Sequence, residues 1–207
     1  MSSTCGKGEI LRRIIHRWSC RGVGVEISAE WAAEARSKIV ASNLADSVKI
    51  VQEDGANYEG TRESLDAALC IGASWIWGGL AGTLEALSRW TRPHGMVVVG
   101  EPFWINEPSK EHLKAAELER SSFGTHAQNV ETGTKLGLHL LHALVSSHDE
   151  WDRYEGYQWY AMEKYALDNP DDPDIGELLS RMRKFRDIYL TWGRDGLGWA
   201  VYLFLKP

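Results

Sequence analysis

Short runs of strand-forming hydrophobic residues alternate with stretches of helical spacing along the first half of the chain. The runs typical of buried strands are residues 22–27, 48–51, 65–71 and 96–99, and the helical stretches are 8–18, 28–43 and 79–91. This alternation is typical of a mostly parallel sheet with helices on both faces. The pattern therefore predicts an α/β fold.

The second half of the chain has a different pattern, in which helical spacing dominates. Helices are predicted over about 108–120, 147–167 and 174–192, with a polar loop around 123–126 between the first two. Ser147 and Glu150 have the spacing of a capping box at the start of the longest helix. Residues 138–145 are compatible with a strand or a helix, and 197–205 predict a closing strand.

Composition narrows the class of protein further. The chain has 207 residues, 43% of them hydrophobic, which is enough for one domain with one core. Its apolar runs are too short to cross a membrane, and its N-terminus has no signal peptide pattern, so we expect a cytoplasmic protein. The net charge of −6 comes from the second half, which argues against nucleic acid as a partner. The three cysteines lack the spacing of a metal site or a disulfide framework, so we expect reduced thiols and no metal.

Candidate chemistry lies where the predicted strands end. Gly6 and Gly8 form a Gly-x-Gly loop before the first helix, but Leu11 stands where a dinucleotide fingerprint has its third glycine. Glu26 ends the next strand, where an acid can accept hydrogen bonds from ribose hydroxyls, and Asp54 ends the strand after it. Ordinary solvation of these acids in loops is the alternative interpretation.

These motifs, taken in order, resemble those of the class I S-adenosylmethionine (SAM) dependent methyltransferases. The matching segments are Cys5-Gly6-Lys7-Gly8-Glu9, Glu26-Ile27-Ser28, Asp54-Gly55-Ala56, the strand from Asp66 to Ser74, and the turn Arg92-Pro93-His94-Gly95. The resemblance covers residues 5 to about 101, and the strand at 197–205 is similar to the final antiparallel strand of the family. It implies a Rossmann-like single domain, with a cofactor-binding half at 1–105 and substrate-side helices with a closing hairpin at 106–207.

The resemblance also implies a SAM site made by Cys5, Gly6, Gly8, Glu26, Ile27, Asp54, Gly55, Ala56, Ile71 and Gly72. Two positions depart from the family pattern, because Ser2 stands where the family has an acid and Thr4 where it has the first glycine. The apolar residues of the family's first strand are absent, so we expect this strand to be largely missing. A homodimer that exchanges a strand at the gap, or low thermal stability, would follow.

A methyl acceptor would bind beyond the ends of the fourth and fifth strands. The predicted aromatic pocket consists of Trp75, Trp77, Phe103, Trp104, Trp151 and Tyr154, for which core packing is the alternative role. Glu101 ends a buried strand and is a candidate catalytic base, with a structural hydrogen bond as the alternative role. His126 is a second candidate base in the polar loop.

The leading hypothesis is therefore SAM-dependent methyl transfer to a small molecule. The residues after the fourth strand, Ile71-Gly72-Ala73-Ser74, do not form the Asn/Asp-Pro-Pro-aromatic tetrad that would suggest methylation of DNA bases. One alternative is a non-catalytic methyltransferase-like domain with impaired SAM binding. The other is an NAD-dependent oxidoreductase, against which Leu11 argues.

Overall fold

The computed structural model describes all 207 residues and divides them into two compact units. Unit 1 comprises Met1–Glu101, Asn129–Ala143 and Val201–Pro207, and unit 2 comprises Pro102–Gln128 and Leu144–Ala200. These units interleave along the chain. The single domain with a cofactor-binding half at 1–105 and substrate-side helices at 106–207 stays a prediction.

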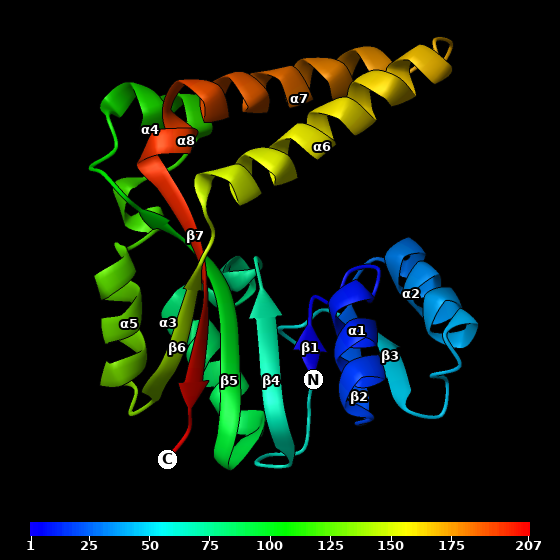
Figure 1. Cartoon of the computed structure of the whole chain (residues 1–207), viewed down its shortest axis with the longest axis vertical. Helices are drawn as coiled ribbons and strands as arrows, with labels where there is room; N and C mark the ends of the chain where they lie inside the picture. Colours follow the sequence, from blue (N-terminus) through cyan, green and yellow to red (C-terminus); the bar gives the residue numbers. More distant parts are fainter. The chain divides into compact units, whose positions relative to one another are not determined.

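Seven strands form one sheet, in the order β3-β2-β1-β4-β5-β7-β6 (Figure 1). Their bounds are β1 Ser2–Ser3, β2 Gly22–Glu26, β3 Val48–Gln52, β4 Leu65–Ile71, β5 Thr91–Trp104, β6 His139–Val145 and β7 Leu197–Leu205. The first five strands pair in parallel. β7 runs antiparallel to β5. The amide of residue 94 donates a hydrogen bond to the carbonyl oxygen of residue 206, and the amide of residue 105 donates one to that of residue 196. The predicted Rossmann-like, mostly parallel sheet with an antiparallel last strand is confirmed.

The first strand, expected to be largely missing, is present as two residues at the centre of the sheet. Ser2 pairs with Gly24 of β2 and Leu69 of β4, and Ser3 pairs with the next residue of each strand. Ser3 is fully buried, and its hydroxyl donates to the Leu69 carbonyl oxygen at 3.1 Å. Backbone pairing and one hydroxyl thus make a strand without apolar side chains. The homodimer stays a prediction.

Helices α1 (Glu9–Trp18), α2 (Ala29–Ala41) and α3 (Leu80–Trp90) of unit 1 begin and end within two residues of the predicted positions. Ser28 caps α2 as the sequence suggests, because its hydroxyl accepts the Trp31 amide at 3.2 Å. α1 and α2 contribute to one buried cluster that consists of Leu11, Ile15, Ala32, Ala35 and Ile50. This packing holds the loop between β1 and α1 on a rigid base.

Two local features differ from the predictions. The loop expected around 123–126 is followed at once by helix α5 (His126–Lys135), whose buried positions are Asn129 and Gly133. Because these buried residues are polar or small, the helix leaves no apolar pattern in the sequence. The predicted turn at 93–95 is a bulge inside β5, where His94 has a φ of +61°.

Unit 2 is mainly helical. Its elements are α4 (Lys110–Ala116), the 3₁₀ turn η2 (Arg120–Ser122), α6 (His148–Asp168), α7 (Ile175–Ile188), the π-helix η3 (Tyr189–Gly193) and α8 (Arg194–Gly196). α4 is shorter than predicted, because Glu117 ends it with a φ of +57°. The predicted capping box of Ser147 and Glu150 is present at the start of α6. α6 and α7 lie side by side (Figure 1), and neither has a fully buried residue. No helix of the chain combines the length and the apolar character needed to cross a membrane.

Candidate functional site

The loop between β1 and α1 lies at the carboxyl ends of the parallel strands in unit 1. Gly6 and Gly8 adopt left-handed conformations with φ of +54° and +76°, which glycine tolerates without strain. A Cβ added to Gly6 would have no atom within 4 Å, so the loop backbone borders open space there. The Cys5 amide donates to the Val25 carbonyl oxygen at 2.8 Å, which fixes the loop to β2.

Glu26, at the end of β2, connects this loop to the start of α2. One carboxylate oxygen accepts the Gly6 amide at 2.8 Å, and the other accepts the Ser28 amide at 3.0 Å. The side chain is buried, with 5% of its surface exposed. Each carboxylate oxygen has a second lone pair, so Glu26 can still accept hydrogen bonds from a ligand.

An apolar surface and a tight turn follow at the ends of β2 and β3. Ile27, the residue after Glu26, is 64% exposed, which is unusual for a large apolar side chain beside a buried acid. The carboxylate of Asp54 accepts a hydrogen bond from the Ala56 amide at 2.9 Å, and this bond shapes the turn after β3. The 3₁₀ turn η1 comprises Ser74–Trp77. A Cβ on Gly55 would lie 2.9 Å from the Cδ1 methyl of Ile76 in η1, so a larger residue would require the Ile76 side chain to move.

Glu101 lies next to Ser74, which follows β4. The sequence predicts that Glu101 ends its strand, but β5 continues to Trp104. Gly72, which follows Ile71, has a φ of +71°, and its amide donates to the Gly100 carbonyl oxygen at 3.0 Å. The Ser74 hydroxyl donates to one carboxylate oxygen of Glu101 at 2.9 Å, and the other oxygen is buried without a partner. Glu101 is only 4% exposed.

This environment changes the proton affinity of Glu101. Burial raises its pKa to about 7, although the hydrogen bond from Ser74 acts in the opposite direction. Burial is also the main reason why the pKa of Cys5 is raised to about 11, with repulsion from Glu26 second, so this thiol is no nucleophile near neutral pH. Glu101 is thus the group of this site whose protonation can change near neutral pH.

The predicted pocket aromatics have different surroundings in the two units. In unit 1, Trp75 is 72% exposed, whereas the buried indole nitrogen of Trp77 has no partner and its ring packs edge-on against Trp90. In unit 2, Phe103 is buried against the ring of His126, with ring centroids 5.0 Å apart. Phe103 and Trp151 line one cavity of unit 2, so the structure brings part of the predicted set together there.

Four further predicted residues lie in unit 2. Trp104 is 2% exposed, and its indole nitrogen donates to the Arg120 carbonyl oxygen at 3.1 Å, as for a packing residue. Trp151 and Tyr154 of α6 both line a cavity of unit 2. His126 is the first residue of α5 rather than part of a loop.

Sequence reasoning missed Ser74 as a partner of Glu101. Its only signal was its place three residues after the end of β4, in the segment Ile71-Gly72-Ala73-Ser74. The amide of Ser28 was missed as well, because a backbone donor leaves no mark in the sequence.

A model of the family described as "Methyltransferase domain" matches residues 2–95, the part of the chain that holds the glycine loop and Glu26. The protein YjhP of Escherichia coli (strain K12), described as uncharacterized, is 30% identical over 202 residues, which are 97% of this chain and 81% of YjhP. The chain belongs to the class I SAM-dependent methyltransferase family.

Solved structures agree with this assignment. A SAM-dependent methyltransferase from Thiobacillus denitrificans in complex with S-adenosyl-L-homocysteine is 31% identical, with a TM-score of 0.89 and coverage of 100% of this chain and 84% of the other. A SAM-dependent methyltransferase from Geobacter sulfurreducens, with the same ligand, is 28% identical, with a TM-score of 0.90 and coverage of 100% and 83%. SAM is the methyl-donor cofactor of this fold.

The residues present fit such a cofactor. The loop offers backbone next to open space at Gly6, Glu26 offers a buried acceptor with spare lone pairs, and Ile27 offers an exposed apolar surface. These are groups that the charged amino-acid end, the ribose and the adenine of SAM can each contact.

Proposed function

We propose that this protein transfers the methyl group of SAM to a small-molecule acceptor. The observation that carries the proposal is the double hydrogen bonding of Glu26, which fixes its carboxylate between the glycine loop and α2. A buried acid held in this way is ready to accept hydroxyl donors without further ordering, which lowers the entropic cost of binding.

The residues that would hold SAM all belong to unit 1. Cys5, Gly6 and Gly8 would face the amino-acid end, Glu26 the ribose hydroxyls, and Ile27 the adenine ring. The turn Asp54–Ala56 would border the adenine amino group, and Ile71 with Gly72 would border the sulfonium. The complexes of relatives with S-adenosyl-L-homocysteine support this assignment.

Bound SAM supplies an electrophilic methyl group on a sulfonium sulfur, so the protein has to align an acceptor and remove its proton. Glu101 is the residue we assign to proton removal. One of its oxygens is held by Ser74 and the other has no partner, so the second oxygen is left to accept a proton. A pKa of about 7 suits a general base that works near neutral pH.

Calorimetric titration of SAM and S-adenosyl-L-homocysteine tests the donor site. The Glu26→Gln variant should weaken SAM binding by about 30-fold, because the amide loses the charge and points one N–H at a backbone N–H. Glu30→Gln, an exposed acid in the first turn of α2, is the matched control and should change the affinity less than about twofold.

Two results would count against the proposal. If the wild-type protein showed no heat with SAM up to millimolar concentration, the non-catalytic alternative would hold. If Glu26→Gln bound SAM as tightly as the wild type, the assigned site would be wrong.

Release of S-adenosyl-L-homocysteine, measured over a panel of amines, alcohols and thiols, tests the reaction. With an acceptor that turns over, Glu101→Gln should lower kcat by about 100-fold or more and leave the SAM affinity within about twofold. An unchanged kcat would assign Glu101 a structural role, and His126→Ala would then test the second candidate base.

A further inference from the structure

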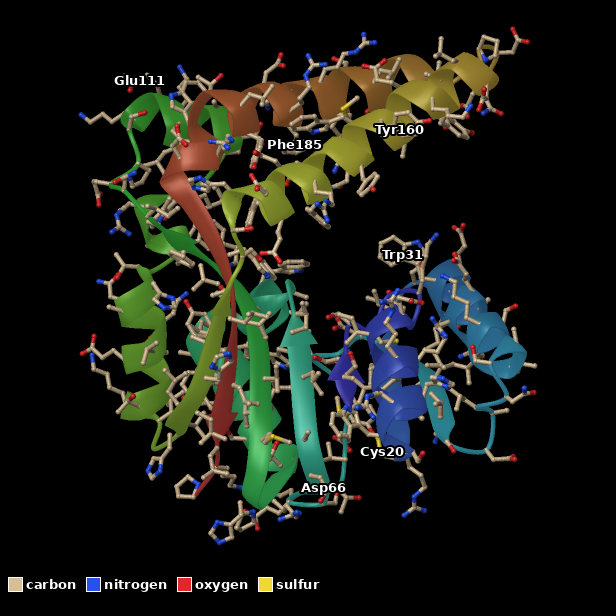
Figure 2. All side chains as sticks on the ribbon, viewed as in Figure 1. Cys20, Trp31, Asp66, Glu111, Tyr160 and Phe185 are labelled. Carbon is tan, nitrogen blue, oxygen red and sulfur yellow. The ribbon has the colours of Figure 1, made fainter.

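Unit 2 contains a groove that the fold leaves open between α6 and α7. Its volume is about 570 Å³, within the usual range for small-molecule sites. The apolar walls are formed mainly by Trp151, Trp159, Met162, Met182, Phe185 and Ile188. Figure 2 shows Phe185 on the side of α7 that faces α6, and this ring is still 53% exposed.

One carboxylate of the groove has no partner. Glu155 of α6 lines the groove and is partly buried, and it makes no hydrogen bond or ion pair in the structure. Burial raises its pKa above the usual range, as expected for an acid without a compensating charge. An uncompensated carboxylate among apolar side chains is costly, and a cation would relieve that cost.

The neighbouring charges do not supply this cation. Arg194 is paired with Asp152 at 3.0 Å, and Asp152 also accepts the Tyr189 hydroxyl at 2.7 Å. Arg181, the arginine that lines the groove, is exposed and lies over the ring of Phe185, 5.8 Å from its centroid. The Glu155 carboxylate is therefore available to form an ion pair with a bound ligand.

We propose that this groove binds an apolar amine, with the ammonium group paired to Glu155 and the apolar body covering the aromatic walls. The indole and phenol rings that line the same groove favour a cation further, because their faces attract positive charge. The proposal concerns binding to unit 2 and does not depend on SAM or on methyl transfer.

Three probes of one shape and different charge test the proposal: 4-phenylbutylamine, 4-phenylbutan-1-ol and 4-phenylbutanoate. At pH 8 the amine is protonated, and we expect it to bind about tenfold more tightly than the alcohol and more tightly still than the carboxylate. Calorimetry gives the affinities, and the indole N–H signals of Trp151 and Trp159 in NMR spectra should shift and so locate the amine.

Glu155→Gln keeps the shape of the side chain and removes its charge. It should lower the affinity for the amine about tenfold and change the affinity for the alcohol by less than about twofold. Glu177→Gln, which removes an exposed acid from α7 outside the groove, should change neither affinity. The Glu155→Gln variant should fold as well as the wild type, because it loses an unpaired charge, and its thermal unfolding midpoint checks this.

Equal affinities of the wild type for amine and alcohol, or tighter binding of the carboxylate, would overturn the proposal. So would amine binding that is unaffected by Glu155→Gln, shifts confined to tryptophans outside the groove, or the absence of amine binding up to its solubility. None of these measurements involves SAM, so their failure would leave the proposed methyl transfer untouched.

Discussion

The sheet of unit 1 and the helical hairpin α6–α7 of unit 2 use their apolar residues in opposite ways. Val25, Leu84 and Val97 of unit 1 are fully buried, whereas none of the 35 residues of the two helices is buried. In the hairpin, Tyr154 is 65% exposed and Phe185 is 53% exposed. The first region is stabilised by its own packing, and the second keeps apolar surface available for something else.

This difference has consequences for the two proposed sites. Glu26 and the glycine loop are held by packed helices and by three hydrogen bonds to β2 and α2, so the donor site is formed in advance. The hairpin depends on capping, on ion pairs such as Arg183–Glu163, and on partial burial, which together contribute little. Regions with few buried contacts open locally at low free-energy cost, and ligand sites that adapt are drawn from them.

The largest expected effect compares two leucines. Leu84→Ala in α3 should lower the free energy of unfolding by about 3 kcal/mol, because it leaves a cavity in a closed core. Leu178→Ala in α7, where the side chain is 38% exposed, should lower it by less than about 1 kcal/mol. Urea denaturation measures both, and equal losses would show that the hairpin is packed as tightly as the sheet.

The next comparison uses the two carboxyl groups with raised pKa. The folded chain holds the proton of Glu101 up to pH about 7, whereas the unfolded chain releases it near pH 4.5. Between these values the native state binds more protons, so the free energy of unfolding falls as pH rises, by up to about 3 kcal/mol from this group. Glu101→Gln should remove this fall, and Glu155→Gln should remove a separate and smaller fall that comes from Glu155 in the more open hairpin.

Denaturation midpoints of the wild type and both variants at pH 4.5, 6 and 8 measure these slopes. If Glu155→Gln changed the slope more than Glu101→Gln, the hairpin would exclude water better than the sheet, and the comparison would be reversed.

The smallest expected effect concerns Thr4, which has a φ of +52° in a chain position where the family has glycine. This conformation is strained for a β-branched residue, and glycine adopts it freely. Thr4→Gly should raise the free energy of unfolding by about 1 kcal/mol. This is the net effect of relieving the backbone strain and of the larger conformational entropy that glycine loses on folding. A loss of stability would mean that the Thr4 hydroxyl, which donates to the Ser3 carbonyl oxygen at 2.6 Å, outweighs the strain.

Much of unit 1 could be predicted from the sequence, because its strands are continuous apolar runs and its helices begin at recognisable signals. β4 and β7 begin and end where predicted. α5 could not be predicted, since its buried positions are Asn129 and Gly133, and neither could β1, since its pairing uses backbone groups that every sequence possesses.

The residues of the candidate site could be predicted where a side chain itself carries the chemistry. They could not be predicted where burial and packing decide which groups a residue contacts. Glu26 ends β2 as predicted, whereas β5 continues three residues beyond Glu101, to Trp104. The partner of Glu101, Ser74, and the open surroundings of Glu155 depend on how segments pack. The aromatic residues show the same limit, because sequence alone does not separate the buried Trp104 from the exposed Trp75.

The π-helix Tyr189–Gly193 sets where this chain tolerates a change in length. A π-turn is an α-turn with one extra residue, so deletion of one residue there would leave an ordinary helix with the same flanking segments. One residue lost from β7 would instead turn every side chain of the strand to the opposite face, and its buried positions alternate strictly from Gly198 to Phe204. Variation in length among homologous chains is therefore expected in η3 and not in the strand that follows it.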